Sequence, residues 1–599
     1  MKTKNREIKW IFGALLLLFA FFLTFPVLRL LAKSFQGEGG LTLAHYGRML
    51  GSKGFGKALA NSILVSAASG AVTTVQAFFL AYTIHYTNVP RGLKRFLKTA
   101  AVLPMLLPTL TYGFAIIYSF GKQGLITRLV GRQLFDIYGF NGLLLGYVIY
   151  TLPISFLLIH NTMAYIDKRF GIVSRIMGDS GLSTFWITII RPLLGTLAAS
   201  FIQSFFLCFT DFGIPASVGG RFEVIAAVLY DEMLGSVPDF AGGAVVAMVM
   251  LLPSAVSIAL LHFLEKYNVR YSRLSPMEPE GNRVRDVVCG VGSTGILVCV
   301  LSVFLVIFLV PFVSEWPYEL HFTLEHVRSV FTDQSLVQVV SNSLRVALCT
   351  AAVGTLAAYG GALIVARSTV GHRCREIVEG IALVTNTIPG MVIGLAFLFS
   401  FSGTPMQNTF FLIILCNVVH FFSTPYLMMK SSLAKMNASW ETTAMLMGDS
   451  WIKTILRVVT PNAFSTIVEV FGYYFVNAMV TVSAVIFLAG ARTMVMTTKI
   501  KELQYLNKYN EVFVLSMLIL FINLAAKGVF ALLAGAGKNR AKGIRLFSRQ
   551  KQTEGRAQLL RPRRLMAEAS YGRGILWRRH PMAEAGSVCE GEEKTAVYR

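Results

Sequence analysis

The sequence predicts an all-α polytopic membrane protein of about 12 transmembrane helices, built as two parallel six-helix repeats. Of its 599 residues, 54% are hydrophobic and only 14% are Asp, Glu, Lys or Arg, against about 25% charged residues in soluble domains. Apolar runs of roughly 20 residues, the length that crosses a bilayer, recur along the chain. An internal repeat divides these runs into two equal sets. These three observations argue against a soluble fold.

Each set contains six apolar runs. The first six lie near residues 10–31, 60–84, 97–120, 142–160, 193–218 and 241–263. The second six lie near residues 289–312, 341–366, 377–401, 409–429, 462–490 and 512–535. Lys2, Lys4, Arg6 and Lys9 precede the first run, and no small-residue cleavage site interrupts it, so we expect a retained first span.

The net charge is 55 − 31 = +24, which in a membrane protein needs no nucleic-acid partner. Cations gather in alternate loops between the apolar runs. They are Arg91, Lys94, Arg95, Lys168, Arg169, Arg175, Lys266, Arg270, Arg273, Arg367, Arg373 and Arg375. The positive-inside rule therefore predicts that these loops and both termini are cytoplasmic.

The loops divide the chain into four segments. Residues 1–265 form the first half, and residues 289–536 form the second half. Residues 266–288 carry prolines and a glycine among charges, as expected of a cytoplasmic linker. Residues 537–599 are basic and lack apolar periodicity, which predicts a disordered cytoplasmic tail.

The internal repeat is the strongest signal in the sequence. Asn61-Ser62-Ile63 opens the second run and Asn342-Ser343-Leu344 opens the eighth, an offset of 342 − 61 = 281. At the same offset, Pro108, Gly113 and Ala115 are matched by Pro389, Gly394 and Ala396. The number of runs between the copies is even, so both halves have the same orientation. A parallel pseudo-dimer places a pathway on the pseudo-twofold axis.

A second repeat lies in the loop after the fourth run of each half, residues 163–192 and 430–461. In the later copy, the stretch Glu441–Met447 suits a helix, Gly448 can take the left-handed conformation that ends it, and Asp449 or Ser450 can cap the next helix. An amphipathic stretch then leads to Pro461. The expected helix–turn–helix would fit a groove on a soluble partner.

The earlier copy of this loop keeps the same turn. Gly178, Asp179 and Ser180 stand where the later copy has Gly448, Asp449 and Ser450, at an offset of 270, and Pro192 follows. A simple return turn into the membrane would also use a Gly and a Pro. Two copies of Met-Gly-Asp-Ser at matching places favour a docking element instead.

The loop resembles the "EAA" loop of ATP-binding-cassette (ABC) importer permeases, whose pattern is Glu-Ala-Ala, three residues, Gly, nine residues, Ile, one residue, Leu-Pro. Gly448 and Pro461, thirteen residues apart, match the Gly and the Pro, and Val458 stands for the Ile. We call residues 163–192 and 430–461 the first and second coupling loops.

The coupling loops also depart from the EAA pattern. Thr442, Thr443 and Ala444 occupy the Glu-Ala-Ala positions, with Glu441 one place early. In the first loop, Pro192 is fourteen rather than thirteen residues after Gly178, and no acidic residue stands at those positions. Either the first half couples less tightly or its acidic contact is supplied elsewhere.

The resemblance implies the type I ABC importer permease fold in a bacterial plasma (inner) membrane. It implies two ABC ATPase subunits on the cytoplasmic side, contacted through the coupling loops, and an extracytoplasmic substrate-binding protein. Such a permease is not an enzyme and binds no cofactor or metal itself, because its partners bind the ATP. Consistent with this, the chain lacks a Gly-x-x-x-x-Gly-Lys-Ser/Thr phosphate loop.

Two segments resemble the fused two-half permeases for ferric iron and 2-aminoethylphosphonate. They are Phe209–Pro215 and Phe475–Leu488, and the second is closer to the aminoethylphosphonate members. Both belong to fifth spans rich in small and hydroxylated residues, which suit close helix packing or a polar path. We take Thr210, Asp211, Asn477, Thr481 and Ser483 as candidates for the translocation path.

The main alternative is a secondary transporter with twelve helices, driven by an ion gradient. It would need intramembrane carboxylates, and beyond Asp211, Glu379 and Glu469 the sequence offers few. A membrane-embedded enzyme would need a cluster of His, Asp and Glu at membrane depth, and the sequence offers none. We therefore favour the ABC importer permease.

Overall fold

The computed structural model describes residues 6–264 and 281–536, except Glu38, Lys168, Thr369 and Ala438. Residues 1–537 form one compact unit. The predicted tail and most of the predicted linker lie outside the described residues. Helix α15 begins at Arg283, inside the stretch predicted as linker, because the Asn282 side chain caps it by accepting from the Arg285 N–H at 3.1 Å.

The first half of the chain is helical apart from one short hairpin. Its elements are α1 (Arg6–Phe19), η1 (Ala20–Thr24), α2 (Phe25–Ser34), β1 (Gln36–Gly37), β2 (Gly40–Leu41), α3 (Ala44–Gly51), α4 (Lys53–Tyr86), α5 (Arg91–Ala100), η2 (Leu103–Leu106), α6 (Thr109–Phe120), α7 (Leu125–Val130), α8 (Phe140–Met163), α9 (Arg169–Ile176), α10 (Gly181–Phe185), η3 (Trp186–Ile190), α11 (Arg191–Thr210), α12 (Pro215–Val218), α13 (Ile225–Leu234) and α14 (Phe240–Leu264).

The second half repeats this order. Its elements are α15 (Arg283–Leu309), η5 (Val310–Phe312), β3 (Val313–Glu315), β4 (Glu319–Phe322), α16 (Glu325–Thr332), α17 (Gln334–Ala366), α18 (His372–Thr387), α19 (Gly390–Phe401), α20 (Phe410–His420), α21 (Ser423–Ala434), α22 (Ser439–Leu446), α23 (Trp451–Thr454), η6 (Ile455–Val459), α24 (Thr460–Val480), α25 (Met496–Tyr505) and a last helix, Tyr509–Ala536.

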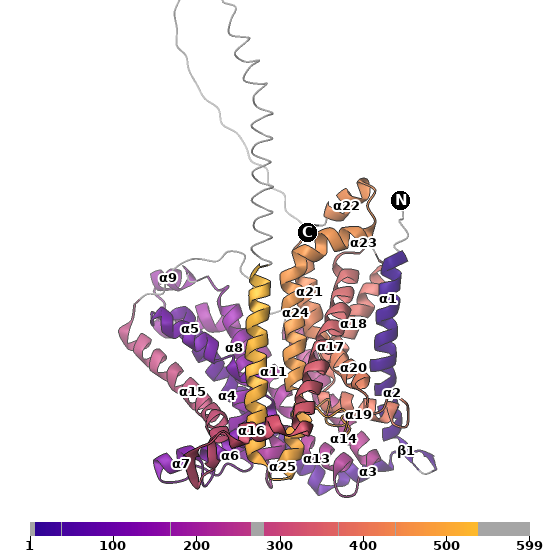
Figure 1. The fold of residues 1–599 in the computed structure, drawn as a ribbon. Coiled ribbons are helices and arrows are strands. Elements are labelled where there is room, and N and C mark those ends of the chain that lie inside the picture. Colours follow the sequence, from indigo (N-terminus) through magenta and orange to yellow (C-terminus); the bar gives the residue numbers. More distant parts are fainter. Residues whose placement is uncertain are drawn as a thin grey trace, which may run out of the picture. The chain divides into compact units, whose positions relative to one another are not determined.

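Among the described residues, nine helices are long and apolar enough to cross a membrane, or up to twelve if each bent helix pair is one span. The predicted all-α fold of about 12 transmembrane helices is confirmed. Helices α9, α22 and α23 lie at one end of the helices, which we call the loop end, and α3 and α25 lie at the other, the far end (Figure 1).

The third span of each half is broken at the repeated prolines. The segments on either side of Pro108 are bent by 109°, and those on either side of Pro389 by 104°. A proline has no N–H to donate and disfavours a helical residue before it, so a helix cannot run through either position undisturbed. The sequence predicted continuous spans near 97–120 and 377–401, and the break corrects that expectation.

The repeated Asn-Ser pairs hold the same contact in both halves. Ser62 Oγ accepts from the Ile225 N–H at 2.8 Å, and Ser343 Oγ accepts from the Met496 N–H at 2.7 Å. These N–H groups begin α13 and α25, where a helix has free donors. Asn61 adds a bond from Nδ2 to the Glu223 carbonyl at 3.0 Å. The pairs therefore fasten the short far-end helices to α4 and α17.

The repeated glycines mark close backbone contacts. A Cβ atom on Gly113 would lie 1.6 Å from Ser217 Oγ, and one on Gly394 would lie 2.4 Å from the Ala484 carbonyl oxygen. In each half, the broken third span thus packs against the segment that follows the fifth span, which is the short helix α12 in the first half and a turn in the second. No side chain fits at either contact.

The two halves exchange their first spans. Helices α1 and α2 pack on α17 and α19 of the second half, and α15 packs on α4, α5 and α6 of the first. Phe19 lies 4.5 Å from Phe422 between ring centroids, and the hydroxyls of Thr83 and Ser293 are 2.7 Å apart. Figure 1 shows α1 and α15 on opposite sides of the helices.

The last helix also crosses to the other half. The Thr111 and Ser516 hydroxyls are 3.0 Å apart, and Asn523 Nδ2 donates to the Leu106 carbonyl at 2.9 Å. Asn523 thus satisfies a carbonyl beside the break in the third span of the first half. Because of these exchanges, the halves cannot separate without exposing polar groups to lipid.

We expect Ser343→Ala to lower the free energy of unfolding by about 1–3 kcal/mol, because it leaves the buried Met496 N–H without an acceptor. Thermal unfolding in detergent would show this as a lower midpoint. Ser302→Ala is the control, since that hydroxyl donates to the Cys299 carbonyl of its own helix at 2.8 Å. Equal midpoints for the two variants would contradict the capping role.

Candidate functional site

A cavity of about 410 Å³ lies between the two halves. Its walls come from α6, α8 and α11 of the first half and from α18, α19, α21 and α24 of the second. The five residues predicted for the translocation path all line it, although they come from segments far apart in the sequence. They are Thr210, Asp211, Asn477, Thr481 and Ser483.

The cavity lining is polar but carries little charge. Gln203, Tyr150, Tyr473, Asn386 and His420 add amide, phenol and imidazole groups. Among the described residues that line the cavity, Asp211 is the one carboxylate, and there is no Lys or Arg. The formal charge of the lining is therefore negative or zero, depending on Asp211.

Asp211 has a structural contact as well as a place in the lining. It follows the last residue of α11, and its Oδ2 accepts from the Ile214 N–H at 2.9 Å, which stabilises the turn into α12. The matching position of the second half is Thr481, which follows α24. The two halves thus share the break in the chain but differ in charge there.

Two of the lining side chains use a donor within their own helices. Thr210 Oγ1 donates to the Phe206 carbonyl at 2.9 Å, and one N–H of Asn477 Nδ2 donates to the Tyr473 carbonyl at 2.8 Å. Both side chains keep an oxygen that can accept from or coordinate a cargo, in a lining that also holds amide and phenol donors. Oxygen acceptors and a carboxylate suit a cation better than an anion.

The second coupling loop is the predicted helix–turn–helix. Gly448 has φ +81°, in the left-handed region, between α22 and α23. Ser450, rather than Asp449, caps α23, because its hydroxyl accepts from the Lys453 N–H at 3.4 Å. Asp449 instead pairs with the Lys453 ammonium.

The second coupling loop presents apolar side chains at its turn. Leu446 and Met447 are 85% and 80% exposed. Thr442 and Thr443 are exposed and Ala444 is half-buried on α22. Exposed apolar side chains of this size at a helix–turn–helix mark a surface that a partner covers.

The first coupling loop has the same geometry with different bonds. Gly178 has φ +85°, and Ser180 Oγ accepts from the Ser183 N–H at 3.3 Å to cap α10. The Asp179 carboxylate accepts from the Ser174 hydroxyl, and the Ser174 and Thr184 hydroxyls are 3.1 Å apart.

Matching side chains open the first helix of each coupling loop. Asp167 accepts from the Arg169 N–H at 3.0 Å before α9, and Asn437 accepts from the Ser439 N–H at 2.9 Å before α22. The backbone hydrogen bond from Arg169 holds the pKa of Asp167 below its ordinary value. The exposed apolar set of the first loop is Ile176, Met177 and Leu182.

Both coupling loops enter the fifth span through one π-helical turn. Turn η3 ends just before Pro192 enters α11, and η6 ends just before Pro461 enters α24. The wider turn accommodates a proline, which has no N–H to donate. Gly178 and Pro192 are fourteen residues apart, one more than Gly448 and Pro461. The extra residue lies in the helix before the π-helical turn, because α10 has five residues and α23 has four.

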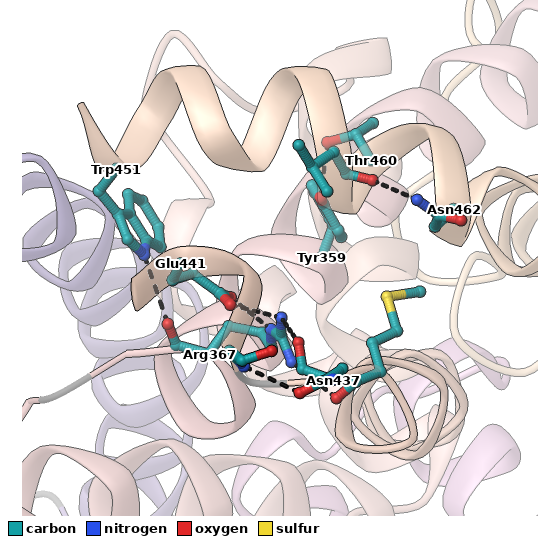
Figure 2. Close-up of polar contacts among 10 residues, drawn as sticks. Tyr359, Arg367, Asn437, Glu441, Trp451, Thr460 and Asn462 are labelled. Atoms are coloured by element: carbon teal, nitrogen blue, oxygen red, sulfur yellow. Dashed lines mark hydrogen bonds and ion pairs between the residues drawn. The ribbon is translucent and has the colours of Figure 1, made fainter. Parts of the chain in front are cut away.

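Arg367, which the sequence singled out only as a loop cation, is the centre of the second coupling loop. Its Nε is 2.6 Å from Glu441 Oε1, and its Nη2 donates to Glu441 Oε2 at 2.6 Å (Figure 2). Nη1 and Nη2 also donate to the Met436 and Asn437 carbonyls at 2.9 Å each. Its own carbonyl accepts from Trp451 Nε1 at 3.3 Å. No spacing in the sequence signals this contact across 441 − 367 = 74 residues.

Comparisons with known proteins agree with this architecture. Residues 358–536 match the family described as binding-protein-dependent transport system inner membrane component. The ferric transport system permease protein FbpB of Actinobacillus pleuropneumoniae is 26% identical over 521 residues, covering 82% of this chain and 74% of the relative. The putative ferric transport system permease protein FbpB 1 of Haemophilus influenzae is 26% identical over 511 residues, covering 81% and 79%.

A more distant relative covers less of the chain. The probable sulfate transport system permease protein cysT of Helicosporidium is 25% identical over 185 residues, covering 30% of this chain and 67% of the relative. The family matched at residues 358–536 is described as binding-protein-dependent, so the ion-gradient-driven secondary transporter is set aside. A domain of this family at residues 358–536, similarity to ferric uptake permeases over about four-fifths of the chain and up to twelve candidate spans in its described residues together support an inner-membrane ABC importer permease of the type I fold.

Proposed function

We propose that the chain carries ferric iron through the central cavity, delivered by an extracytoplasmic binding protein and driven by two ABC ATPase subunits. The observation that carries this proposal is the charge of the cavity. Its lining holds Asp211 and no Lys or Arg among the described residues. A ferric cargo gains from a carboxylate at membrane depth, whereas a sulfate or phosphonate anion finds no counter-charge there.

The relatives support the same choice. Two of them, similar over about four-fifths of this chain, are named as ferric transport permeases, while the sulfate permease covers 30% of it. We therefore rank 2-aminoethylphosphonate, the other cargo that the sequence suggested, second. Thr210, Asn477, Thr481 and Ser483 would complete the path as neutral oxygen donors.

We further propose that the coupling loops dock on the ATPases at a cytoplasmic loop end. Both loops share a left-handed glycine, a serine cap and an exposed apolar turn. In this arrangement the ATPases bind ATP, and the chain itself binds no cofactor. Movement of a docked loop passes into α11 or α24 at Pro192 or Pro461, because each loop continues directly into its fifth span.

We expect Asp211→Asn to lower ferric uptake about tenfold, a change that corresponds to about 1.4 kcal/mol. Asparagine keeps an oxygen that can accept from the Ile214 N–H, so the turn should hold while the charge is lost. The measurement is radioactive iron uptake into proteoliposomes that contain the permease with its ATPase and binding protein, with sulfate and 2-aminoethylphosphonate as competitors.

Asp239→Asn is the matched control for this experiment. Asp239 also caps a helix, accepting from the Ala241 and Gly242 N–H groups at 3.0 and 2.9 Å, but it does not line the cavity. Equal uptake by the Asp211→Asn and Asp239→Asn proteins, or competition by either anion, would overturn the ferric assignment.

We expect Gly448→Val to abolish uptake while ATP hydrolysis by the partner subunits continues. A Cβ on Gly448 meets nothing within 4 Å, so the defect would come from its φ of +81°, which a β-branched residue adopts only under strain. Gly448→Asn should retain partial uptake, since asparagine tolerates this region.

Gly371→Val controls for the added side chain. Gly371 also has no atom within 4 Å of a Cβ, but its φ is −56°. Uptake and ATP hydrolysis would be measured at matched membrane abundance. Normal uptake by the Gly448→Val protein would mean that the second coupling loop does not transmit ATPase motion.

A further inference from the structure

We propose that Arg367 is a positioning residue that fixes the second coupling loop, and that Glu441 serves this internal ion pair rather than an ATPase contact. The inference rests on the proposed docking of the loop. It assigns the acidic residue of the loop a partner within the chain. It also means that the two coupling loops of one permease are held to the helices by different contacts.

Arg367 joins three segments that would otherwise be free to move apart. It follows α17, and its guanidinium binds the Met436 and Asn437 carbonyls beyond the end of α21. The same group forms an ion pair with Glu441 in the first turn of α22, with one hydrogen bond from Nη2 to Oε2. Its carbonyl receives the indole N–H of Trp451, the first residue of α23. Figure 2 shows these partners converging on Arg367.

The burial of the pair decides the role of Glu441. The Arg367 side chain is 2% exposed and that of Glu441 is 13% exposed. One carboxylate oxygen already accepts from the guanidinium and the other lies 2.6 Å from Nε, so the charge of Glu441 is paired inside the chain. The loop surface left for a partner holds Thr442, Thr443 and the apolar turn at Leu446 and Met447. In this proposal the partner covers the apolar turn, and the ion pair sets the orientation of that turn.

The described residues of the first coupling loop have no such ion pair at the matching positions. The position that matches Arg367 at the 281 offset is Tyr86, and the position that matches Glu441 at the 270 offset of the loops is Gly171. There, the Phe185 ring packs edge-on against Phe78 and Tyr82, with centroids 6.2 and 5.9 Å apart. Aromatic packing is less directional than a buried, hydrogen-bonded ion pair, so the two loops are oriented by different kinds of contact.

The test asks whether a second substitution, at Glu441, improves or worsens the coupling of the Arg367→Met protein. In Arg367→Met, the Glu441 carboxylate remains buried without its partner, and a buried single charge is costly. Adding Glu441→Gln to Arg367→Met removes that charge and should improve coupling if the pair is internal. If Glu441 contacts an ATPase, the added substitution should make coupling worse. Arg373→Met, at an exposed cation of the same end, is the matched control.

The first measurement is trypsin cleavage of the purified full chain without ATPase. Arg367→Met should raise cleavage after Lys435 and Lys453 about tenfold and leave cleavage after Arg169 and Arg175 unchanged, because only the second loop is loosened. Equal cleavage of the second loop in the parent and variant proteins would overturn the clamp. This result does not depend on the proposed function, because no partner is present.

The second measurement is ATP hydrolysed per iron imported by the complex. Arg367→Met should raise this ratio at least about fivefold, and the double variant should return to within about twofold of the parent. A double variant that couples worse than Arg367→Met would overturn the assignment of Glu441. A parent chain that assembles with no ATPase would instead overturn the proposed function. If Arg367→Met does not accumulate, Arg367→Lys serves in its place, since it keeps the charge and loses the planar guanidinium that binds Glu441 and two carbonyls at once.

Discussion

The fold depends on one constraint: within a bilayer, each backbone N–H and C=O must find a partner in the protein. The chain nevertheless breaks its helices, at Pro108 and Pro389 in the third spans and after α11 and α24 in the fifth. Near several of these breaks, a side chain supplies a hydrogen-bond partner that the helix does not. Ser62 and Ser343 accept the first N–H groups of α13 and α25, and Asn523 donates to a carbonyl beside the first break.

These breaks also create the cavity. A bundle of unbroken apolar helices would present only side chains to its axis, whereas here the ends of α11 and α24 and the bends of the third spans meet there. The turn residue Asp211 is polar because its carboxylate accepts a backbone N–H, and Thr481 stands at the matching turn of the second half. The same polarity makes a path for a hydrated cargo. The exchange of the first spans then holds the two sides of that path together.

The sequence predicts the fold class and the repeat because both are local or periodic. Apolar run length predicts the spans, and the repeated Gly and Ser predict the left-handed turn and the cap of the coupling loops. The five candidate path residues share one cavity because both fifth spans end at the axis. The breaks at Pro108 and Pro389, the span exchange and the Arg367–Glu441 pair depend on tertiary packing, which carries no periodic signal.

The residues that repeat and those that differ fall into two physical classes. Repeated residues shape the backbone: the Asn-Ser pairs and the serine caps supply hydrogen-bond partners, the prolines break the third spans, and the contact glycines permit close packing in both halves. Differences occur where the chain faces something else, with Asp211 opposite Thr481 at the cavity and Tyr86 opposite Arg367 at the coupling loops. Losing one partner of a buried ion pair costs about 3–5 kcal/mol, so an asymmetric pair such as Arg367–Glu441 persists only where its geometry is needed. The residues that shape the backbone therefore follow the pseudo-twofold symmetry. The residues that we propose to act on the cargo and on coupling, Asp211 and Arg367, are ones that differ between the halves.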